Sequence, residues 1–263
     1  MSSLFAAGLF QDQVWLVTGG GTGIGLTIAT QAAALGAKVA ICGRKKESLE
    51  AARDKELAGR EVLATTCDIR SDEEVERMVK EVLARFGRID VLINNAGGQF
   101  RTLAEDCKPK GFDAVVRNNL LGTWRVIYYV ANLAMIPQKR GCVVNIIAQI
   151  RNGFPGMIHT GAARAGVDNL TKTAAVEWAP HGIRVNAVAP GAIWSSGTAR
   201  YPREVMELAA QSQPIQRLGT VEEVAHVTLF LASDRASAFT TGQTFYVDGG
   251  QSLSCGLWAN SKL

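Results

Sequence analysis

A glycine-rich run, TGGGTGIG at residues 18–25, stands near the start of the chain between an apolar stretch of strand length and a stretch of helix length. Glycines let a diphosphate approach the backbone closely, and the free amides and dipole of a helix N-terminus attract its negative charge. Tight turns also use glycine, but a position between a strand and a helix predicts a loop that binds the pyrophosphate of a dinucleotide. The expected contacts are Gly19, Thr22, Gly23, Ile24 and Gly25.

The residues after the second apolar run indicate which dinucleotide would bind. A loop of this kind usually has an acidic residue there, which holds the adenosine ribose hydroxyls. This chain has Gly43 followed by Arg44, Lys45 and Lys46. A carboxylate would repel a 2′-phosphate, whereas the Arg44 guanidinium can bind one through two charge-assisted hydrogen bonds. Arg44 and Lys45 therefore favour NADP(H) over NAD(H); the alternative is a basic turn that only faces solvent.

The elements that must position these residues alternate along the chain, with apolar runs of strand length followed by amphipathic segments of helix length. This alternation predicts βαβ units and a Rossmann-type, doubly wound α/β fold, in which one seven-stranded parallel sheet is covered by helices on both faces. No linker, charge run or repeat divides residues 1–263, so we expect a single domain. The expected strands are Val14–Val17, Val39–Cys42, Val62–Cys67, Val91–Asn94, Cys142–Ile146, Val185–Ala189 and Thr244–Val247.

Two Ser/Thr-x-x-Glu patterns predict capping boxes at helix starts. Ser71 with Glu74 opens one amphipathic segment, and Thr220 with Glu223 opens another that runs to about Ala232. The longest segment without a strand, residues 194–214, follows the sixth expected strand and contains an expected helix at residues 202–211. Because ligands bind beyond the carboxyl ends of the strands in such sheets, we expect residues 194–214 to form a substrate lid.

The composition limits the classes of partner. The net charge of +4 comes from scattered Lys and Arg rather than from a basic block, which argues against nucleic acid. Five widely spaced cysteines without a CxxC pair predict a reduced compartment and no metal site. Residues 13–37 are uncharged over a length that could cross a bilayer, but the central glycines argue against a membrane span. The N-terminus lacks the basic residues of a secretory signal, so we expect a soluble intracellular protein.

Five motifs, in order along the chain, resemble those of the short-chain dehydrogenase/reductase family. They are TGGGTGIG (18–25), NNAG (94–97), NNLLG (118–122), RVNAVAPG (184–191) and YVDGG (246–250). The resemblance implies an oxidoreductase whose catalytic asparagine is Asn119. The NNAG residues could equally have a structural role. The cofactor contacts that the resemblance implies are Asp68 and Ile69 at the adenine, Asn95, Ala96 and Gly97 along the ribose, and Pro190, Gly191 and Ile193 at the nicotinamide end.

The usual acid/base residues of the family are missing. Alcohol-oxidising members use a serine and a Tyr-x-x-x-Lys pair, but here Thr160 stands at the tyrosine position and Arg164 at the lysine position. The serine position falls on Ile147 or Ala148. Threonine does not ionise near neutral pH, and arginine stays charged. Thr160 can donate a hydrogen bond but cannot act as tyrosinate does, which argues against ordinary carbonyl–alcohol interconversion.

Hydride addition to a conjugated C=C bond needs hydrogen-bond donors for the developing oxygen charge more than it needs a strong acid. Residues 98–100 and 144–167 resemble the branch of peroxisomal trans-2-enoyl-CoA reductases, which also has a small hydroxyl residue and an arginine at these two positions. We therefore expect NADPH-dependent reduction of a trans-2-enoyl-CoA in fatty acid metabolism. Thr160 and Asn119 would bind the thioester oxygen and Arg164 the nicotinamide ribose, and the α-carbon proton would come from solvent or through His159.

Several alternatives stay open. Thr160 could simply be the N-cap of the helix that follows it, and Arg164 could be a surface ion-pair residue. The protein could be an NAD(P)-dependent dehydrogenase of an alcohol, a terpenoid alcohol or a 3-hydroxyacyl substrate, with Tyr128, Tyr129 or Tyr201 as its acid/base group. It could also be a non-catalytic dinucleotide-binding subunit, a role that the intact glycine loop and Asn119 argue against.

Two further expectations concern the surroundings of the molecule. The resemblance implies a homo-tetramer or homo-dimer formed through the fourth and fifth helices, where Val167, Leu170, Ala174 and Trp178 follow helical spacing. A core-facing helix surface would show the same spacing. The tripeptide at residues 261–263, Ser-Lys-Leu, is a peroxisomal address. In a eukaryotic cell we expect a peroxisomal location and binding to the import receptor, and otherwise the cytoplasm.

Overall fold

The computed structural model describes residues 4–198 and 201–253. The expected peroxisomal address, Ser261-Lys262-Leu263, lies outside the described residues, and so do Cys255 and two residues of the expected lid, 199 and 200. The other four cysteines are free thiols.

Seven parallel strands form one sheet in the order β3-β2-β1-β4-β5-β6-β7, which confirms the predicted Rossmann-type sheet. Each expected strand is present, and most are one or two residues longer or shorter than the sequence pattern predicted. The strands are β1 (Val14–Thr18), β2 (Lys38–Gly43), β3 (Val62–Thr66), β4 (Val91–Asn94), β5 (Gly141–Ile146), β6 (Ile183–Pro190) and β7 (Thr244–Val247).

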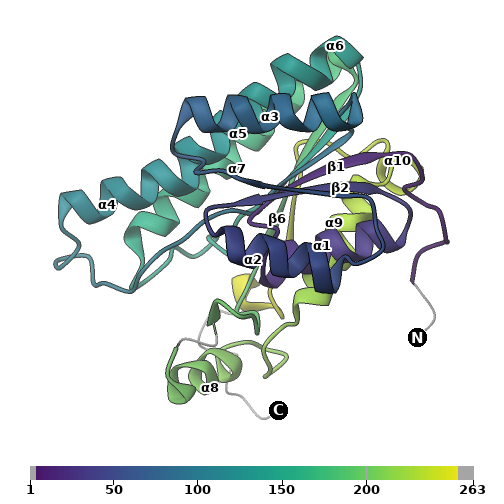
Figure 1. Ribbon diagram of the computed structural model, residues 1–263. Coiled ribbons are helices and arrows are strands. Elements are labelled where there is room, and N and C mark those ends of the chain that lie inside the picture. Colours follow the sequence, from purple (N-terminus) through teal and green to yellow (C-terminus); the bar gives the residue numbers. More distant parts are fainter. Residues whose placement is uncertain (1–3, 199–200, 254–263) are drawn as a thin grey trace.

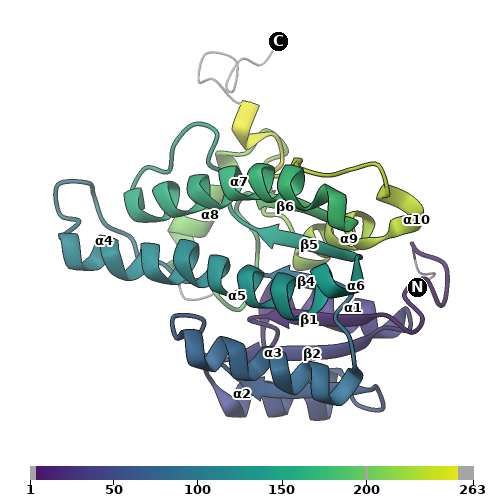
Figure 2. The same ribbon diagram turned by 90° about the horizontal axis from the view of Figure 1, so that it is seen from above.

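Helices cover both faces of the sheet, and the two views in Figures 1 and 2 show the layers. The first face carries α1 (Gly23–Ala34), α2 (Lys46–Ala51) and α9 (Val221–Ala232). The second carries α3 (Asp72–Phe86), a helix assembled from α4 (Pro109–Val116), α5 (Gly122–Val130) and α6 (Ile136–Gln138), and α7 (Ile158–Trp178). The helix α8 (Arg203–Gln211) projects from the body of the molecule in Figure 1, and the short α10 (Asp234–Ser237) follows α9.

Alternation of side chains across the sheet explains the uncharged stretch at residues 13–37. Within β1, Trp15 and Val17 pack into the core under α1 and α9, whereas Val14 and Leu16 pack into the core under α3 and α5. Both faces of the strand are buried, so neither can carry a charge. No helix among the described residues is long and apolar enough to span a membrane.

One of the two predicted capping boxes forms and the other is incomplete. At the start of α9, Thr220 Oγ1 accepts from the Glu223 amide, and the Glu223 carboxylate accepts from the Thr220 amide at 2.8 Å. At the start of α3, Ser71 Oγ accepts from the Glu74 amide, but the Glu74 carboxylate accepts from the Asp68 amide instead. The prediction for Ser71 and Glu74 was therefore half wrong, because the preceding loop offers the carboxylate another amide.

The long helix on the second face widens at two π-helical turns, Arg117–Leu121 and Ala131–Met135, which join α4, α5 and α6. Single π-helical turns inside α-helices are frequent at functional sites. The first of them carries Asn119 and turns its side chain into the protein, where it is fully buried.

The next helix, α7, faces the core with the residues that the sequence analysis considered for an interface. Val167 and Ala174 are buried, and Leu170 and Trp178 are half-buried against the core that contains Ala174. A helix that covers a sheet needs the same periodic apolar stripe as one that dimerises, so the spacing is explained without an interface and the oligomer stays a prediction.

Candidate active site

The sheet places the candidate site where its strand order reverses. The connection from β1 leads to one neighbouring strand, β2, and β4 lies on the other side of β1. In such sheets ligands bind in the crevice at the carboxyl ends of these central strands. The glycine loop follows β1, and the NNAG motif begins with the last residue of β4.

Asn95 joins these two segments. Its Nδ2 donates to the carbonyl oxygens of Thr18 and Gly19 at 3.1 and 3.2 Å, and the Asn95 and Ala96 amides both donate to Thr18 Oγ1 at 3.0 Å. Gly25 packs so closely against the Asn95 side chain that no Cβ could be accommodated there. For Asn95 and Ala96 the structure shows a role in shaping the glycine loop.

The glycine loop presents a set of unused amides at the N-terminus of α1. Thr22 is the N-cap, yet its side chain makes no capping hydrogen bond. The amides of residues 21–25 donate to no group of the described chain, whereas those of Gly19 and Gly20 are bound by the Cys42 carbonyl oxygen. Five free amides at a helix N-terminus suit a pyrophosphate, so this loop fits the expected dinucleotide.

The adenine end of the expected cofactor site carries the basic pair. Arg44 and Lys45 are exposed at the end of β2, and neither forms an ion pair with the described residues. Asp68 is held by Arg70, whose Nε donates to Oδ1 at 2.9 Å, and this guanidinium lowers the pKa of the Asp68 carboxyl. Ile69 is buried against Gly122. Arg44 is therefore free to bind a further anion.

Asn119 and Arg164 meet at the other end of the crevice. Asn119 Oδ1 accepts from the Gly98 amide at 2.9 Å and from Asn118 Nδ2 at 3.0 Å, which leaves its own Nδ2 buried without a partner. Arg164 is only 6% exposed, and a side chain at Gly97 would collide with its guanidinium. Gly97 is therefore required for the close approach of Arg164.

The Arg164 guanidinium is a buried cation without a counter-ion. It forms no ion pair or hydrogen bond with any described residue, and burial lowers its pKa to about 10. The alternative interpretation as a surface ion-pair residue was wrong. A buried donor without a protein partner indicates a ligand that completes it.

Thr160 lies one turn before Arg164 on α7. Because the helix begins at Ile158 with Met157 as its N-cap, Thr160 is already inside the first turn, and the N-cap interpretation was wrong. Its side chain is buried, and its Oγ1 lies 3.1 Å from His159 Nδ1.

His159 is fully buried as well. Its ring meets Phe100 edge to face, with the ring centroids 4.5 Å apart, and its Nε2 has no partner among the described residues. Burial lowers the pKa of His159, and a backbone contact with Phe100 offsets part of this shift. The structure thus brings together His159 and Thr160, which the sequence placed side by side without fixing their directions.

The nicotinamide end is framed by β6 and β7. The Gly191 amide donates to the Val247 carbonyl oxygen at 3.0 Å, and Ile193 is buried. The Pro190 carbonyl oxygen accepts a hydrogen bond from the Gln149 amide at 2.8 Å. Gln149, a buried residue that the sequence analysis missed, stands directly after the two positions considered for the absent serine. The sequence signal for Gln149 was a polar residue shortly after the apolar residues that end β5.

The first part of the expected lid covers the glycine loop. The Ser195 amide and the Ile193 carbonyl oxygen both bind Thr198 Oγ1 at 2.8 Å, which folds residues 193–198 into a compact turn. Ser195 and Ser196 lie directly over Gly23, where a Cβ would meet Ser196 Oγ at 3.4 Å. The helix expected at 202–211 is present as α8, with Met206 buried and Leu208 exposed.

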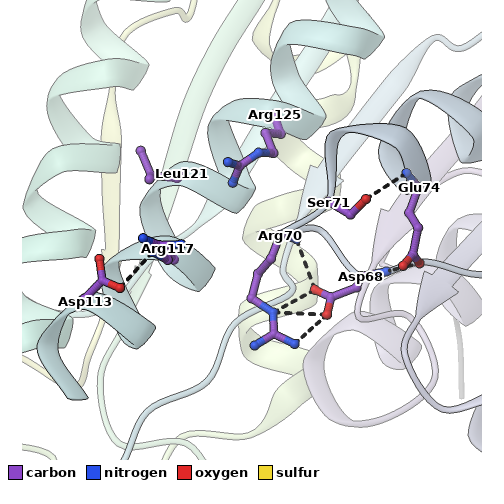
Figure 3. Close-up of a pocket in the computed structure, with 8 residues that line it drawn as sticks. All are labelled: Asp68, Arg70, Ser71, Glu74, Asp113, Arg117, Leu121 and Arg125. Carbon is purple, nitrogen blue, oxygen red and sulfur yellow. Dashed lines mark hydrogen bonds and ion pairs between the residues drawn. The ribbon is translucent and has the colours of Figure 1, made fainter. Parts of the chain in front are cut away.

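A separate cavity of about 630 Å³ lies between the loop before α3 and the helices α4 and α5 (Figure 3). Its three guanidinium groups are each paired: Arg70 with Asp68, Arg117 with Asp113, and Arg125 with Asp72. Its lining includes neither Asn119, Thr160 nor Arg164. Tyr128 lines the adjoining groove beside Trp124, which places it away from the candidate active site.

The chemistry available at the site is that of hydrogen-bond donors and positive charge. Asp168, one turn beyond Arg164, is bound to Lys172 and to Thr244, so it is a structural residue. Asn119 and Arg164 both lie against Gly97, Thr160 lies one turn before Arg164 on α7, and no carboxylate of the described residues bonds to any of the three. Preorganised donors of this kind stabilise negative charge that develops on a substrate oxygen.

Known proteins resemble this chain over most of its length. A family model described as "Enoyl-(Acyl carrier protein) reductase" matches residues 19–252. A probable 2,4-dienoyl-CoA reductase of Bacillus subtilis is 40% identical over 246 residues, which are 91% of this chain and 96% of that protein. A 3-oxoacyl-[acyl-carrier-protein] reductase of Staphylococcus epidermidis is 38% identical over 238 residues, which are 89% of this chain and 97% of that protein.

Among solved structures, a citronellol catabolism dehydrogenase of Pseudomonas aeruginosa is 43% identical and has a TM-score of 0.86, with 96% of this chain and 100% of that chain covered. The matches extend across the glycine loop, the NNAG segment and α7. With its seven-stranded Rossmann sheet and these relatives, the chain belongs to the short-chain dehydrogenase/reductase family of NAD(P)-binding oxidoreductases.

Proposed function

We propose that this oxidoreductase transfers a hydride from NADPH to the β-carbon of a trans-2-enoyl thioester, with an acyl-CoA as the substrate. The observation that supports it most strongly is a set of buried polar groups: Asn119 Nδ2 without a partner, Arg164 without a counter-ion, and the Thr160 hydroxyl one turn before Arg164. Reduction of a conjugated C=C bond needs such donors, because charge builds on the thioester oxygen as the hydride arrives.

Thr160 and Asn119 would bind the substrate, and Arg164 would bind the coenzyme. Thr160 Oγ1 and Asn119 Nδ2 donate hydrogen bonds to the thioester oxygen and hold the enoyl group against the nicotinamide. Arg164 binds the nicotinamide ribose hydroxyls and adds a fixed positive charge near the developing enolate. The α-carbon then takes a proton from solvent. NADPH itself supplies the hydride, and the free amides of residues 21–25 together with Arg44 would hold its phosphates.

The names of the relatives support two kinds of reduction of an acyl thioester, at a C=C bond or at a carbonyl. A 2,4-dienoyl-CoA reductase acts on conjugated C=C bonds, and a 3-oxoacyl-[acyl-carrier-protein] reductase acts on a carbonyl. The absence of tyrosine at position 160 favours the first.

The test measures NADPH oxidation by the purified protein with crotonyl-CoA and identifies the product by mass spectrometry. We expect butyryl-CoA, and we expect Thr160→Val with Asn119→Ala to lower kcat with little change in NADPH binding. Tight NADPH binding without any crotonyl-CoA turnover would overturn the proposal and favour a non-catalytic dinucleotide-binding subunit.

A second candidate function is the oxidation of an alcohol. The 43% identity to a citronellol catabolism dehydrogenase favours it. This function lacks an acid/base group, because Tyr128 on α5 lines a groove that does not include Thr160.

A further inference from the structure

Thr160 differs from the other buried threonines that lie inside helices. Thr123, Thr171 and Thr228 each donate the hydroxyl proton to the backbone carbonyl oxygen four residues earlier, at 2.8 to 3.0 Å. Thr160, in the first turn of α7, donates to no carbonyl oxygen in the part of the chain that the structure describes. Its Oγ1 instead lies 3.1 Å from His159 Nδ1, so the imidazole determines where the Thr160 proton points.

The His159 ring is fixed in one orientation by the segment that follows β4. Phe100 of that segment meets the ring edge to face, with the ring centroids 4.5 Å apart, and the imidazole is fully buried. Phe100 itself packs against Gly111 of α4, where an added Cβ would lie 2.9 Å from the phenyl ring. Nδ1 therefore stays beside the Thr160 hydroxyl, and Nε2 has no hydrogen-bond partner among the described residues.

The single proton of a neutral imidazole can be on either ring nitrogen, with opposite effects on Thr160. Burial lowers the pKa of His159, with a smaller opposing effect of the Phe100 backbone, so the neutral ring predominates near pH 7. A proton on Nε2 would bury an N–H group without an acceptor and would require the Thr160 proton to be donated to Nδ1. A proton on Nδ1 is donated to Thr160 Oγ1, and only an acceptor, Nε2, is left without a partner. Buried N–H groups without an acceptor are the rarer defect in folded proteins, which favours the proton on Nδ1.

Asn119 is oriented in the same way. Its Oδ1 accepts from the Gly98 amide at 2.9 Å and from Asn118 Nδ2 at 3.0 Å, so its own Nδ2 is left as a free donor. Gly98 and Phe100 belong to one short segment after the NNAG motif. This segment occupies the acceptor end of Asn119 directly, and it holds the ring that occupies the acceptor end of Thr160.

We propose that His159 is a positioning residue of the reduction: its Nδ1–H donates to the Thr160 oxygen and thereby leaves the Thr160 proton for the thioester oxygen of the substrate. The proposal rests on the proposed function, because the contact with the substrate is that of Thr160. His159 touches neither substrate nor coenzyme and exchanges no proton during the cycle. The gain in rate comes from a hydroxyl whose proton already points to the place where negative charge develops.

The first experiment locates the proton on the ring. The chain has three histidines, and nitrogen–proton correlation spectra of protein with isotope-labelled histidine distinguish a protonated Nδ1 from a protonated Nε2. His159→Asn identifies the His159 signals by their loss. We expect Nδ1 to carry the proton and Nε2 to carry none near neutral pH. A proton on Nε2 would overturn the proposal.

The second experiment separates positioning from a structural role. Asn and Leu at position 159 are nearly equal in size, but only Asn has an N–H group near the Nδ1 position that can donate to Thr160. We expect His159→Leu to lower kcat for crotonyl-CoA reduction roughly tenfold, in line with the loss of one hydrogen bond, without a change in the KM for NADPH. We expect His159→Asn to keep several-fold more of that rate. Equal losses in the two variants would mean that His159 is only structural and would overturn the proposal.

Thr160→Val provides the control, because it removes the group through which His159 acts. We expect His159→Leu to cause no further loss of kcat in the Thr160→Val protein, and a full additional loss would overturn the proposal. If His159→Leu fails to fold, the proton position in the unmodified protein still decides. No crotonyl-CoA reduction by the unmodified protein would refute the proposed function and this proposal together. Reduction with the proton on Nε2 would refute this proposal alone.

Discussion

Arg44 is the side chain on which the proposed preference for NADP(H) depends. It is exposed at the end of β2 and forms no ion pair or hydrogen bond with the described residues, although its charge is attracted to the Asp68 carboxylate at longer range. A 2′-phosphate could therefore bind the guanidinium directly. We expect Arg44→Ala to raise the KM for NADPH by roughly tenfold, in line with a partly solvated charge-assisted hydrogen bond, and to leave the KM for NADH unchanged.

Arg60→Ala is the control for this substitution. Arg60 is also exposed and unpaired among the described residues, but it precedes β3 at the opposite end of the strands. We expect Arg60→Ala to change neither the KM for NADPH nor the KM for NADH. An unchanged NADPH/NADH ratio in Arg44→Ala would refute the assignment.

Arg164 is expected to be needed for turnover while its buried charge lowers the stability of the folded protein. Burial lowers the Arg164 pKa to about 10, which corresponds to about 3 kcal/mol of unfavourable free energy for the charged form. This cost is present at every pH below about 10, because the folded pKa is the lower one. We expect Arg164→Met to raise the free energy of unfolding by about 1 kcal/mol or more while it abolishes turnover.

The measurement is urea unfolding of the protein without cofactor, together with the rate of crotonyl-CoA reduction. Arg164→Lys is the control: it keeps the positive charge, and we expect it to keep part of the activity and none of the added stability. A lower stability in Arg164→Met would show that an unrecognised partner compensates the charge.

At the residue scale, the sequence indicates which residues belong to the candidate site more readily than it indicates where their side chains point. The motifs singled out Asn119, Thr160 and Arg164, and the structure buries all three side chains, while their catalytic roles stay predictions. The unpaired Asn119 Nδ2 could not be predicted, since it depends on the Gly98 amide occupying the other end of the same side chain. The direction of His159 depends on Phe100, almost sixty residues earlier.

At the scale of single elements, the contribution of the α9 capping box to the stability of the folded protein depends on pH. Arg217 and the Thr220 amide lower the pKa of Glu223 from 4.5 to about 2. The folded pKa is the lower one, so this carboxylate stabilises the native state fully above about pH 4.5, and the contribution is lost as the pH falls towards 2. We expect Glu223→Gln to be less stable than the unmodified protein at pH 6 and to differ little from it near pH 2.

Chemical unfolding at both pH values tests this expectation. Glu222→Gln is the matched control, since Glu222 precedes Glu223 in the first turn of α9 but forms no capping bond. A difference between Glu223→Gln and the unmodified protein that is the same at pH 6 and pH 2 would contradict the role of the charge.

The elements themselves were largely predictable, and the reason is their periodicity. A strand such as β1 is buried on both faces and must be apolar throughout, so its extent is visible in the sequence. The sequence is ambiguous where two structures share one pattern. The apolar stripe of α7 could serve a core or an interface, and Glu74, which binds the Asp68 amide of the preceding loop, could equally have capped its own helix.

At the scale of the whole molecule, the surface of α5 is the place where we expect a second copy to bind. Leu121, Trp124 and Tyr128 follow helical spacing and are 40%, 39% and 46% exposed, a contiguous apolar stripe that α7 does not offer. We expect Trp124→Asp to convert a homo-oligomer to a monomer, because a charge cannot be desolvated in such an interface. Sedimentation velocity measures the change.

Trp124→Phe is the control and should leave the oligomer intact. A protein that sediments as a monomer before any substitution would refute the expected assembly, and an oligomer that survives Trp124→Asp would place the interface elsewhere.

The turn at residues 193–198 has a consequence for the order of events. Ser195 and Ser196 lie over Gly23, so a dinucleotide whose pyrophosphate rests on the amides of residues 21–25 would lie beneath this turn. We expect the coenzyme to enter first and leave last, with its departure limiting each catalytic cycle. NADP⁺ should then inhibit competitively against NADPH and kcat should fall as solvent viscosity rises, whereas a kcat insensitive to viscosity would show that this turn does not restrain the coenzyme.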